Sequence, residues 1–262
     1  MNVTFWGTRA SYPFFTPQHA HLGGDTSCVG LDVPQSRLFI DAGTGLMHAE
    51  PSDGHDVIVL SHFHLDHVLG LPYFLGKKRQ GSLTLASANC SSEQELIAKV
   101  NSVYGGVGFP VSLSLISPQM QFMALPLEPS QVGVWTIRAC ELNHPGRAFG
   151  YRIGVESGRG EVVYLSDHEH GTEADARMVE FSREAALVIW DSSYDDLTFS
   201  GFKGWGHSTW QEGVRFREAC QAQRLALSHH DPSRTDEIAR AIEAQLPRSV
   251  FLAYDRHSLE LA

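Results

Sequence analysis

Four side chains that can bind metal ions lie within six positions, directly after an apolar segment. Residues 56–61 read Asp-Val-Ile-Val-Leu-Ser, a run typical of a buried β-strand, and His62, His64, Asp66 and His67 follow at once. A continuing strand would point alternate side chains to opposite faces, whereas a loop leaving the strand lets all four converge on one point. The alternative is a polar loop with coincidental histidines. The pattern predicts a sheet that carries a metal site at a strand end.

Short apolar or alternating runs predict strands along the whole chain. They lie at 3–6, 27–33, 38–40, 57–60, 83–86, 134–141, 149–155, 162–165, 187–190, 225–228 and 250–253. Ser92 and Thr209 each precede a glutamate by three positions, the capping-box pattern of a helix start, and a third helix is predicted over 236–246. These elements indicate a layered α/β protein with helices outside the sheets. No repeat or linker divides the chain, so one domain over 1–262 is expected.

Three further strand ends carry residues that suit a metal ion. His144 follows the strand at 134–141, Asp167 follows 162–165, and His229 follows 225–228. Each could also be an ordinary surface turn residue. His230 competes with His229 for the role of last ligand, and His229 is preferred because it continues the strand directly.

Composition narrows the class of protein. The four cysteines lie far apart without a CxxC pair, which argues against a zinc ribbon, a redox motif or a disulfide framework. No signal peptide or membrane-spanning run is visible, so we expect a cytoplasmic protein that does not act at membranes. With 20 basic and 30 acidic residues the net charge is -10, which disfavours a long nucleic acid as partner.

The order of these residues resembles that of the metallo-β-lactamase superfamily, whose signature is HxHxDH followed by a later His, an Asp and a final His. The resemblance covers nearly the whole chain and implies a four-layer αββα sandwich that binds two divalent metal ions, with zinc expected and manganese as the alternative. It also implies three groups of ligands: His62, His64 and His144 for the first ion, Asp66, His67 and His229 for the second, and Asp167 between them.

A second motif indicates a branch of the superfamily. Gly206-His207-Ser208-Thr209 is similar to the ribonuclease Z motif whose histidine assists phosphate cleavage, and the branch also contains phosphoribosyl cyclic phosphodiesterases. His207 and Asp66 are therefore the predicted catalytic residues; the alternative is that His207 only helps to cap a helix. Asp41, in a stretch that resembles the family's early strand and turn, is expected to orient a ligand or simply to form the turn. Weaker candidates for contacts near the site are His168, His170, Asp191 and Tyr194.

The resemblance implies hydrolysis of a small or short phosphodiester by a hydroxide shared between two metal ions. Hydrolysis of a carboxylic ester, thioester or lactone is the alternative, and a metal-binding sensor without activity is a third reading. Bacterial ribonuclease Z inserts a long arm that grips transfer RNA between the positions matching His144 and Asp167, but here that interval is 167 minus 144, or 23 residues. Strands at 149–155 and 162–165 and a turn at 157–160 fill it. We therefore expect that the protein does not mature transfer RNA. A homodimer is compatible with the sequence.

Overall fold

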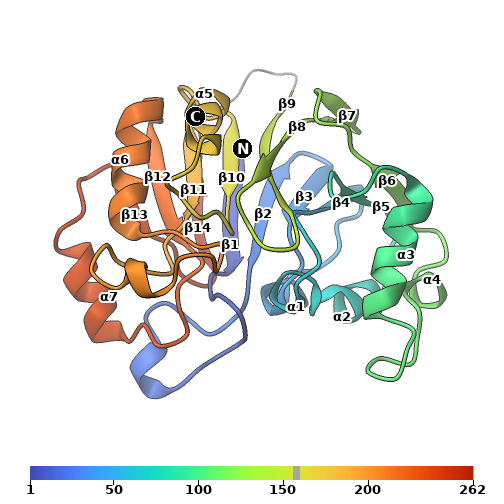
Figure 1. Cartoon of the computed structure of the whole chain (residues 1–262). Helices are drawn as coiled ribbons and strands as arrows, with labels where there is room; N and C mark the ends of the chain where they lie inside the picture. The colour runs from blue at the N-terminus through green and yellow to red at the C-terminus, as the bar shows by residue number, and fades with distance from the viewer. Residues whose placement is uncertain (156–159, 262) are drawn as a thin grey trace.

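Two β-sheets pack face to face in the middle of the molecule, and helices cover the outer face of each (Figure 1). The computed structural model describes residues 1–155 and 160–261. Within them the first sheet has seven strands in the order β14 (His257–Glu260), β1 (Asn2–Gly7), β2 (Cys28–Val33), β3 (Ser36–Ile40), β4 (His55–Leu60), β5 (Ser82–Ser87) and β6 (Gln121–Ala124). The described part of the second sheet also has seven strands, in the order β13 (Val250–Leu252), β12 (Arg224–Ser228), β11 (Leu187–Asp191), β10 (Val162–Leu165), β9 (Ala148–Val155), β8 (Trp135–Leu142) and β7 (Ser130–Val132).

The helices divide between the two outer faces (Figure 1). Beside the first sheet lie α1 (Leu65–Val68), α2 (Leu71–Leu75), α3 (Glu93–Val103) and α4 (Leu113–Ile116), and beside the second lie α5 (Ala174–Phe181), α6 (Trp210–Cys220) and α7 (Asp236–Glu243). The described residues also form three short 3-10 helices, η1 (Pro17–His19), η2 (Thr44–His48) and η3 (Phe199–Gly201). This arrangement confirms the predicted αββα sandwich. Among the described residues no helix is both long and apolar enough to cross a membrane.

Three apolar clusters hold the layers together. The central cluster lies between the sheets and includes Val3, Ile40, Trp135 and Ile189, each at most 1% exposed. Two outer clusters join each sheet to its helices. Burial of this kind stabilises the fold by roughly 25 cal/mol for each Å² of apolar surface removed from water. The polar indole nitrogen of Trp135 is satisfied inside the core because it donates to Ser36 Oγ at 2.9 Å.

Parallel strands bring the site together. Strands β3 to β6 run parallel in the first sheet, and β10 to β13 run parallel in the second. Their carboxyl ends therefore meet along one edge of each sheet, where α/β proteins commonly bind ligands. Most of the residues predicted to bind metal follow β4, β10 and β12, and His144 follows β8.

Most of the predicted elements are present, with differences at particular ends. All eleven predicted strands exist, whereas β6, β7 and β14 were not predicted because they are short and partly exposed. Ser92 and Thr209 do accept the amides of Glu95 and Glu212, at 3.2 and 3.0 Å. The glutamates have other partners than the cap residues: the Glu95 carboxylate accepts from the Ser91 amide, and that of Glu212 accepts from Arg215.

Two further details differ from prediction. The third helix ends at Glu243 rather than at 246. This is consistent with the proline at 247, because helical geometry is disfavoured for the residue before a proline. Asp66 and His67 lie in the short helix α1 rather than in a loop. The predicted turn at 157–160 has residues 157–159 outside the described part of the chain.

Candidate metal centre

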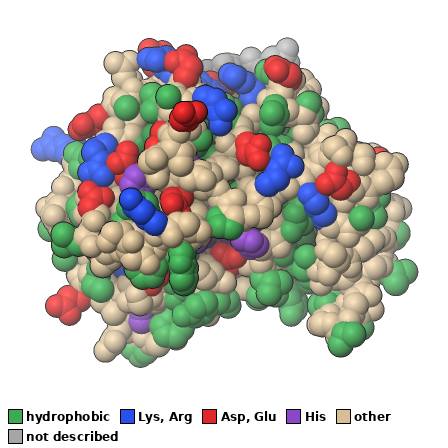
Figure 2. Space-filling view, in the orientation of Figure 1, with side chains coloured by type: hydrophobic (Ala, Val, Ile, Leu, Met, Phe, Trp, Pro, Cys, Tyr) green, Lys and Arg blue, Asp and Glu red, His purple; other side chains and the backbone are tan. Residues whose placement is uncertain are grey.

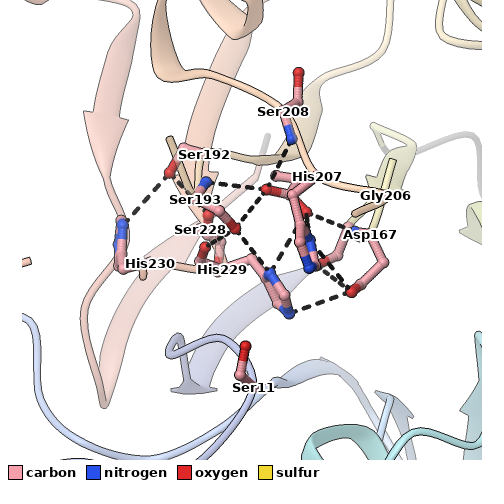
Figure 3. Close-up of polar contacts among 12 residues, drawn as sticks. Ser11, Asp167, Ser192, Ser193, Gly206, His207, Ser208, Ser228, His229 and His230 are labelled. Atoms are coloured by element: carbon pink, nitrogen blue, oxygen red, sulfur yellow. Dashed lines mark hydrogen bonds and ion pairs between the residues drawn. The ribbon is translucent and has the colours of Figure 1, made fainter. Parts of the chain in front are cut away.

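The predicted ligands gather where the ends of strands from both sheets meet. His62 and His64 follow β4, Asp66 and His67 stand in α1, and the remaining three follow strands of the second sheet: His144 after β8, Asp167 after β10 and His229 after β12. Figure 3 shows Asp167 and His229 pointing toward one another from the second sheet. The site therefore spans the edge of the sandwich, with one wall on each sheet.

The side chains form two groups that share a carboxylate. In the first, His144 Nε2 lies 3.2 Å from His64 Nδ1, and the His62 ring centroid is 4.5 Å from that of His64. In the second, Asp66 Oδ2 lies 3.3 Å from His67 Nε2 and 3.4 Å from His229 Nε2.

Asp167 stands between the two groups. Its Oδ2 is 3.0 Å from His67 Nε2, and its Oδ1 is 3.9 Å from His144 Nε2. The ligand atoms of His62, His64 and His144 lie within 4.8 Å of one another, as do those of Asp66, His67 and His229. This spacing allows each group to converge on one cation.

Three buried nitrogen atoms at the centre have no hydrogen-bond partner among the described residues. They are the Nε2 atoms of His62, His67 and His229, and the short contacts of the latter two to carboxylates do not have hydrogen-bond geometry. An unsatisfied buried polar atom is costly and calls for an explanation. Three imidazole lone pairs beside two carboxylates are the donor set that zinc prefers. The residues present therefore fit divalent metal ions.

In three of the imidazoles, the nitrogen that faces away from the centre contacts a neighbouring group. His67 Nδ1 donates to Asp41 Oδ2 at 2.8 Å, and His144 Nδ1 donates to the Gly206 carbonyl at 3.0 Å. His229 Nδ1 lies 3.2 Å from Ser193 Oγ. A proton fixed on Nδ1 leaves Nε2 free to face the centre, which is how metal-binding histidines are usually oriented. Asp41 thus makes the expected orienting contact with a ligand imidazole.

Three non-glycine residues at this edge adopt left-handed backbone geometry. Asp41, Asp167 and His229 have φ values of 60°, 60° and 56°. For residues other than glycine this region costs roughly 1 kcal/mol or more, and such strain collects at functional sites. The sharp turn at each strand end aims the side chain into the site instead of along the sheet.

The charges of the cluster are strongly coupled. Burial lowers the pKa of His62, His64 and His144, so these rings stay neutral as metal ligands must. Burial also opposes charge on His67 and His229, but the surrounding carboxylates, led by Asp167, together outweigh it and raise the pKa of both, that of His229 to about 10. The carboxylates thus favour positive charge at the centre, and bound divalent cations would supply it.

His207 stands beside this centre on a carboxylate of its own. Its Nδ1 donates to Asp191 Oδ2 at 2.8 Å and lies 3.7 Å from Asp167 Oδ1, and its ring stacks on His229 with centroids 5.0 Å apart (Figure 3). Burial lowers the pKa of His207, but the charge and hydrogen bond of Asp191 together with the charge of Asp167 more than compensate, so the pKa is raised above its ordinary value. The alternative role in capping is wrong, because Thr209 is the residue that caps α6.

The two adjacent histidines after β12 face in different directions (Figure 3). His229 points into the cluster, whereas His230 Nε2 donates to the Ala253 carbonyl at 2.8 Å and its Nδ1 lies 2.9 Å from Arg234. Both ring nitrogens of His230 are engaged in the interior. The geometry favours His229 as the ligand.

The weaker candidates have structural contacts near the site. His168 pairs with Asp175 at 3.1 Å, and His170 lies 2.7 Å from Ser208 Oγ. Tyr194 stacks on Phe202 at 4.2 Å. None of these side chains belongs to the groups of converging ligand atoms in the described residues.

Several contributors to the site were not predicted. The Ser11 amide donates to Asp66 Oδ2 at 2.8 Å, and the Tyr164 hydroxyl donates to Asp41 at 2.8 Å. Asp191 was predicted only as a weak candidate, yet it also accepts the Asp167 amide at 3.1 Å. These pairs are 55, 123 and 24 positions apart, so no local spacing could have identified them.

Residues 36–230 match the family model described as the beta-lactamase superfamily domain. The chain belongs to this superfamily. It is 24% identical to ribonuclease Z of Thermoplasma acidophilum over a gapped alignment 293 positions long, which covers 90% of this chain and 88% of that one. The family match and this similarity confirm the predicted superfamily and the predicted relation to ribonuclease Z. The chain is therefore an enzyme of the hydrolase class.

Solved structures of other superfamily members share the fold. Human tRNase Z, short form, superposes with a TM-score of 0.71 at 22% identity over 100% of both chains. A diphosphatase from the PhnP family gives a TM-score of 0.71 at 17% identity, covering 100% of this chain and 98% of that one. At these identities the two structures support the fold alone.

Proposed function

We propose that this chain is a metal-dependent phosphodiesterase that acts on small or short phosphodiesters. The observation that carries the proposal is the His207–Asp191 pair, which stands 3.7 Å from the central carboxylate Asp167 and favours a protonated imidazole. A proton donor at this position serves the departure of an alkoxide, the difficult step for a diester. Relatives named ribonuclease Z and the PhnP-family diphosphatase support phosphate chemistry in this fold.

The proposed centre holds two divalent ions, with zinc expected. His62, His64 and His144 would bind one ion, Asp66, His67 and His229 the other, and Asp167 both. Bound divalent ions of this kind lower the pKa of water and neutralise phosphoryl oxygens. The observation that favours these residues most is that the Nε2 atoms of His62, His67 and His229 are buried without hydrogen-bond partners in the described structure.

The protein groups contribute positioning and a proton. Asp191 holds the His207 ring through Nδ1, so that Nε2 is the nitrogen left to donate a proton to the leaving oxygen. The Ser11 amide fixes one oxygen of Asp66, and its neighbours hold the pKa of Asp66 well below the usual range despite burial. Asp66 would therefore act as a permanently charged carboxylate that orients the second ion and the attacking water.

Two observations support small substrates rather than transfer RNA. Strands β9 and β10 occupy the interval in which ribonuclease Z of the bacterial type carries its arm. In the basic segment Lys77-Lys78-Arg79 two of the three charges are paired, since Lys77 lies 2.8 Å from Glu50 and Arg79 lies 3.6 Å from Asp56. Basic and acidic side chains are interspersed over the face in Figure 2. A folded RNA needs several clustered phosphate contacts.

A substrate panel on zinc-loaded and manganese-loaded protein tests the proposal. It contains bis(4-nitrophenyl) phosphate, cyclic nucleotides, cyclic sugar phosphates, a lactone, a thioester and a precursor transfer RNA. We expect turnover of small diesters and no site-specific cleavage of the precursor. Turnover confined to the lactone or thioester would replace the proposed phosphodiesterase with a carbonyl hydrolase. Efficient cleavage of the precursor at physiological salt would refute the restriction to small substrates.

A further inference from the structure

Glu169 links the loop that carries His207 to the segment that carries Asp167. Its Oε2 accepts hydrogen bonds from the backbone amides of Gly204 and Gly206, at 2.7 and 2.9 Å. Both glycines have left-handed backbone geometry, with φ values of 87° and 86°. A side chain at Gly206 would place its Cβ 2.1 Å from His144 Nδ1, so this close approach requires glycine.

The same loop holds two members of the proposed centre. The Gly206 carbonyl accepts the Nδ1 proton of His144 at 3.0 Å, and the next residue is His207 (Figure 3). Any shift of the Gly206 peptide would therefore move the acceptor that orients His144 and the backbone that positions His207.

The main chain of Glu169 is also fixed to the His144 loop. Its amide donates to the Asn143 carbonyl at 2.9 Å, and the Asn143 side chain donates back to the Glu169 carbonyl at 2.8 Å. One residue thus joins three segments: the end of β10, the loop after β8 and the loop before α6. In the described structure each contributes a proposed ligand or the proposed proton donor.

We propose that Glu169 is a positioning residue that holds His144 toward the metal ions and His207 toward the leaving group. The part of this inference that concerns His207 rests on the proposed function. Among the described residues, the hydrogen bonds of the Glu169 carboxylate are those from the Gly204 and Gly206 amides. Trp205, between these two glycines, is 62% exposed and reports on the same loop.

Variants at this position separate the acceptor from the charge. Glu169→Ala removes the acceptor of both amides, whereas Glu169→Gln keeps an oxygen that can accept both. Glu169→Asp keeps the charge but shortens the reach by one methylene, and it serves if the alanine variant does not fold. The control is Asp195→Ala, which also removes a carboxylate that accepts two backbone amides, those of Leu197 and Thr198, both at 2.9 Å.

Three measurements test the inference. They are zinc retained against a chelator, acrylamide quenching of tryptophan fluorescence, and turnover of diesters with nitrophenolate or alkoxide leaving groups. For Glu169→Ala we expect zinc retention to weaken roughly 10- to 100-fold, the range found for groups that orient metal ligands. Quenching should increase, and turnover should fall more for alkoxide than for nitrophenolate leaving groups. Glu169→Asp should change in the same direction, whereas Glu169→Gln and the control should stay near wild type.

Other outcomes would overturn it. Unchanged zinc retention and quenching in Glu169→Ala, or equal losses in Glu169→Ala and Asp195→Ala, would leave Glu169 without a specific role. If wild type hydrolyses no diester, the proposed function fails, but zinc retention and quenching still decide whether Glu169 positions His144.

Discussion

Asp255 is expected to make the protein less stable as the pH rises. This carboxyl accepts the amides of Gly24 and Asp25 through Oδ2, at 2.8 and 2.9 Å, and the Thr8 hydroxyl through Oδ1 at 3.3 Å. Burial raises the pKa of Asp255 from 3.8 to about 6, and the nearby Asp25 carboxylate adds to this effect. The Arg9 cation acts in the opposite direction without cancelling it.

The sign follows from proton uptake on folding. Between pH 3.8 and about 6 the folded state binds a proton at Asp255 that the unfolded chain has lost. The free energy of unfolding therefore falls as the pH rises through this window. A difference of about two pKa units corresponds to ~3 kcal/mol in total, of which about 1 kcal/mol falls between pH 5 and 7.5.

Asp255→Asn removes the charge and keeps the hydrogen bonds, because the amide oxygen can accept both backbone amides and its nitrogen can donate to Thr8. Urea unfolding at pH 5 and pH 7.5 gives the free energy of unfolding of wild type and variant. In the difference between the two proteins, the contributions of the other titrating groups cancel. We expect the variant to gain about 1 kcal/mol relative to wild type over this range. A difference that stays constant with pH, or that shifts in favour of wild type, would refute the raised pKa.

Three further predictions concern the centre and the fold. Elemental analysis should find two transition-metal ions per chain, and Asp167→Ala should lose both because Asp167 contacts both groups of ligands; one ion in wild type would contradict this. His207→Ala should keep its metal ions but lose turnover by roughly 10²- to 10⁴-fold, most severely for alkoxide leaving groups; equal losses for nitrophenolate would argue against proton donation. Ser92→Ala should lower the free energy of unfolding by about 1 kcal/mol, because the Glu95 amide loses its cap; thermal and urea unfolding would measure it, and an unchanged midpoint would count against the cap.

Ser92 and Glu169 both accept hydrogen bonds from backbone amides. A hydrogen bond to a backbone amide matters most where the amide has no other acceptor and water cannot replace it. Ser92 caps the partly exposed start of α3, whereas Gly206, whose amide donates to Glu169, is buried beside the proposed centre. We therefore expect a modest stability effect at Ser92 and a functional one at Glu169.

The sequence alone determined the features that depend on local pattern. Residues 56–61 and the ligands after them are close in the chain, so their side-chain order predicted both a strand and a cluster at its end. Helix starts at Ser92 and Thr209 were predicted for the same reason, since a cap acts over three positions. The expected order of later strand ends then located His144, Asp167 and His229.

Only the tertiary structure decided which distant groups meet. His229 and His230 are neighbours with the same chemistry, and the left-handed turn at His229 together with the Ala253 carbonyl and Arg234 around His230 separates their directions. Asp191 reaches His207 across 16 positions, and Glu169 reaches Gly206 across 37. Such contacts depend on how strands of a sheet align and how loops close over their ends. Their geometry is set by packing of the whole sandwich, which no local sequence period encodes.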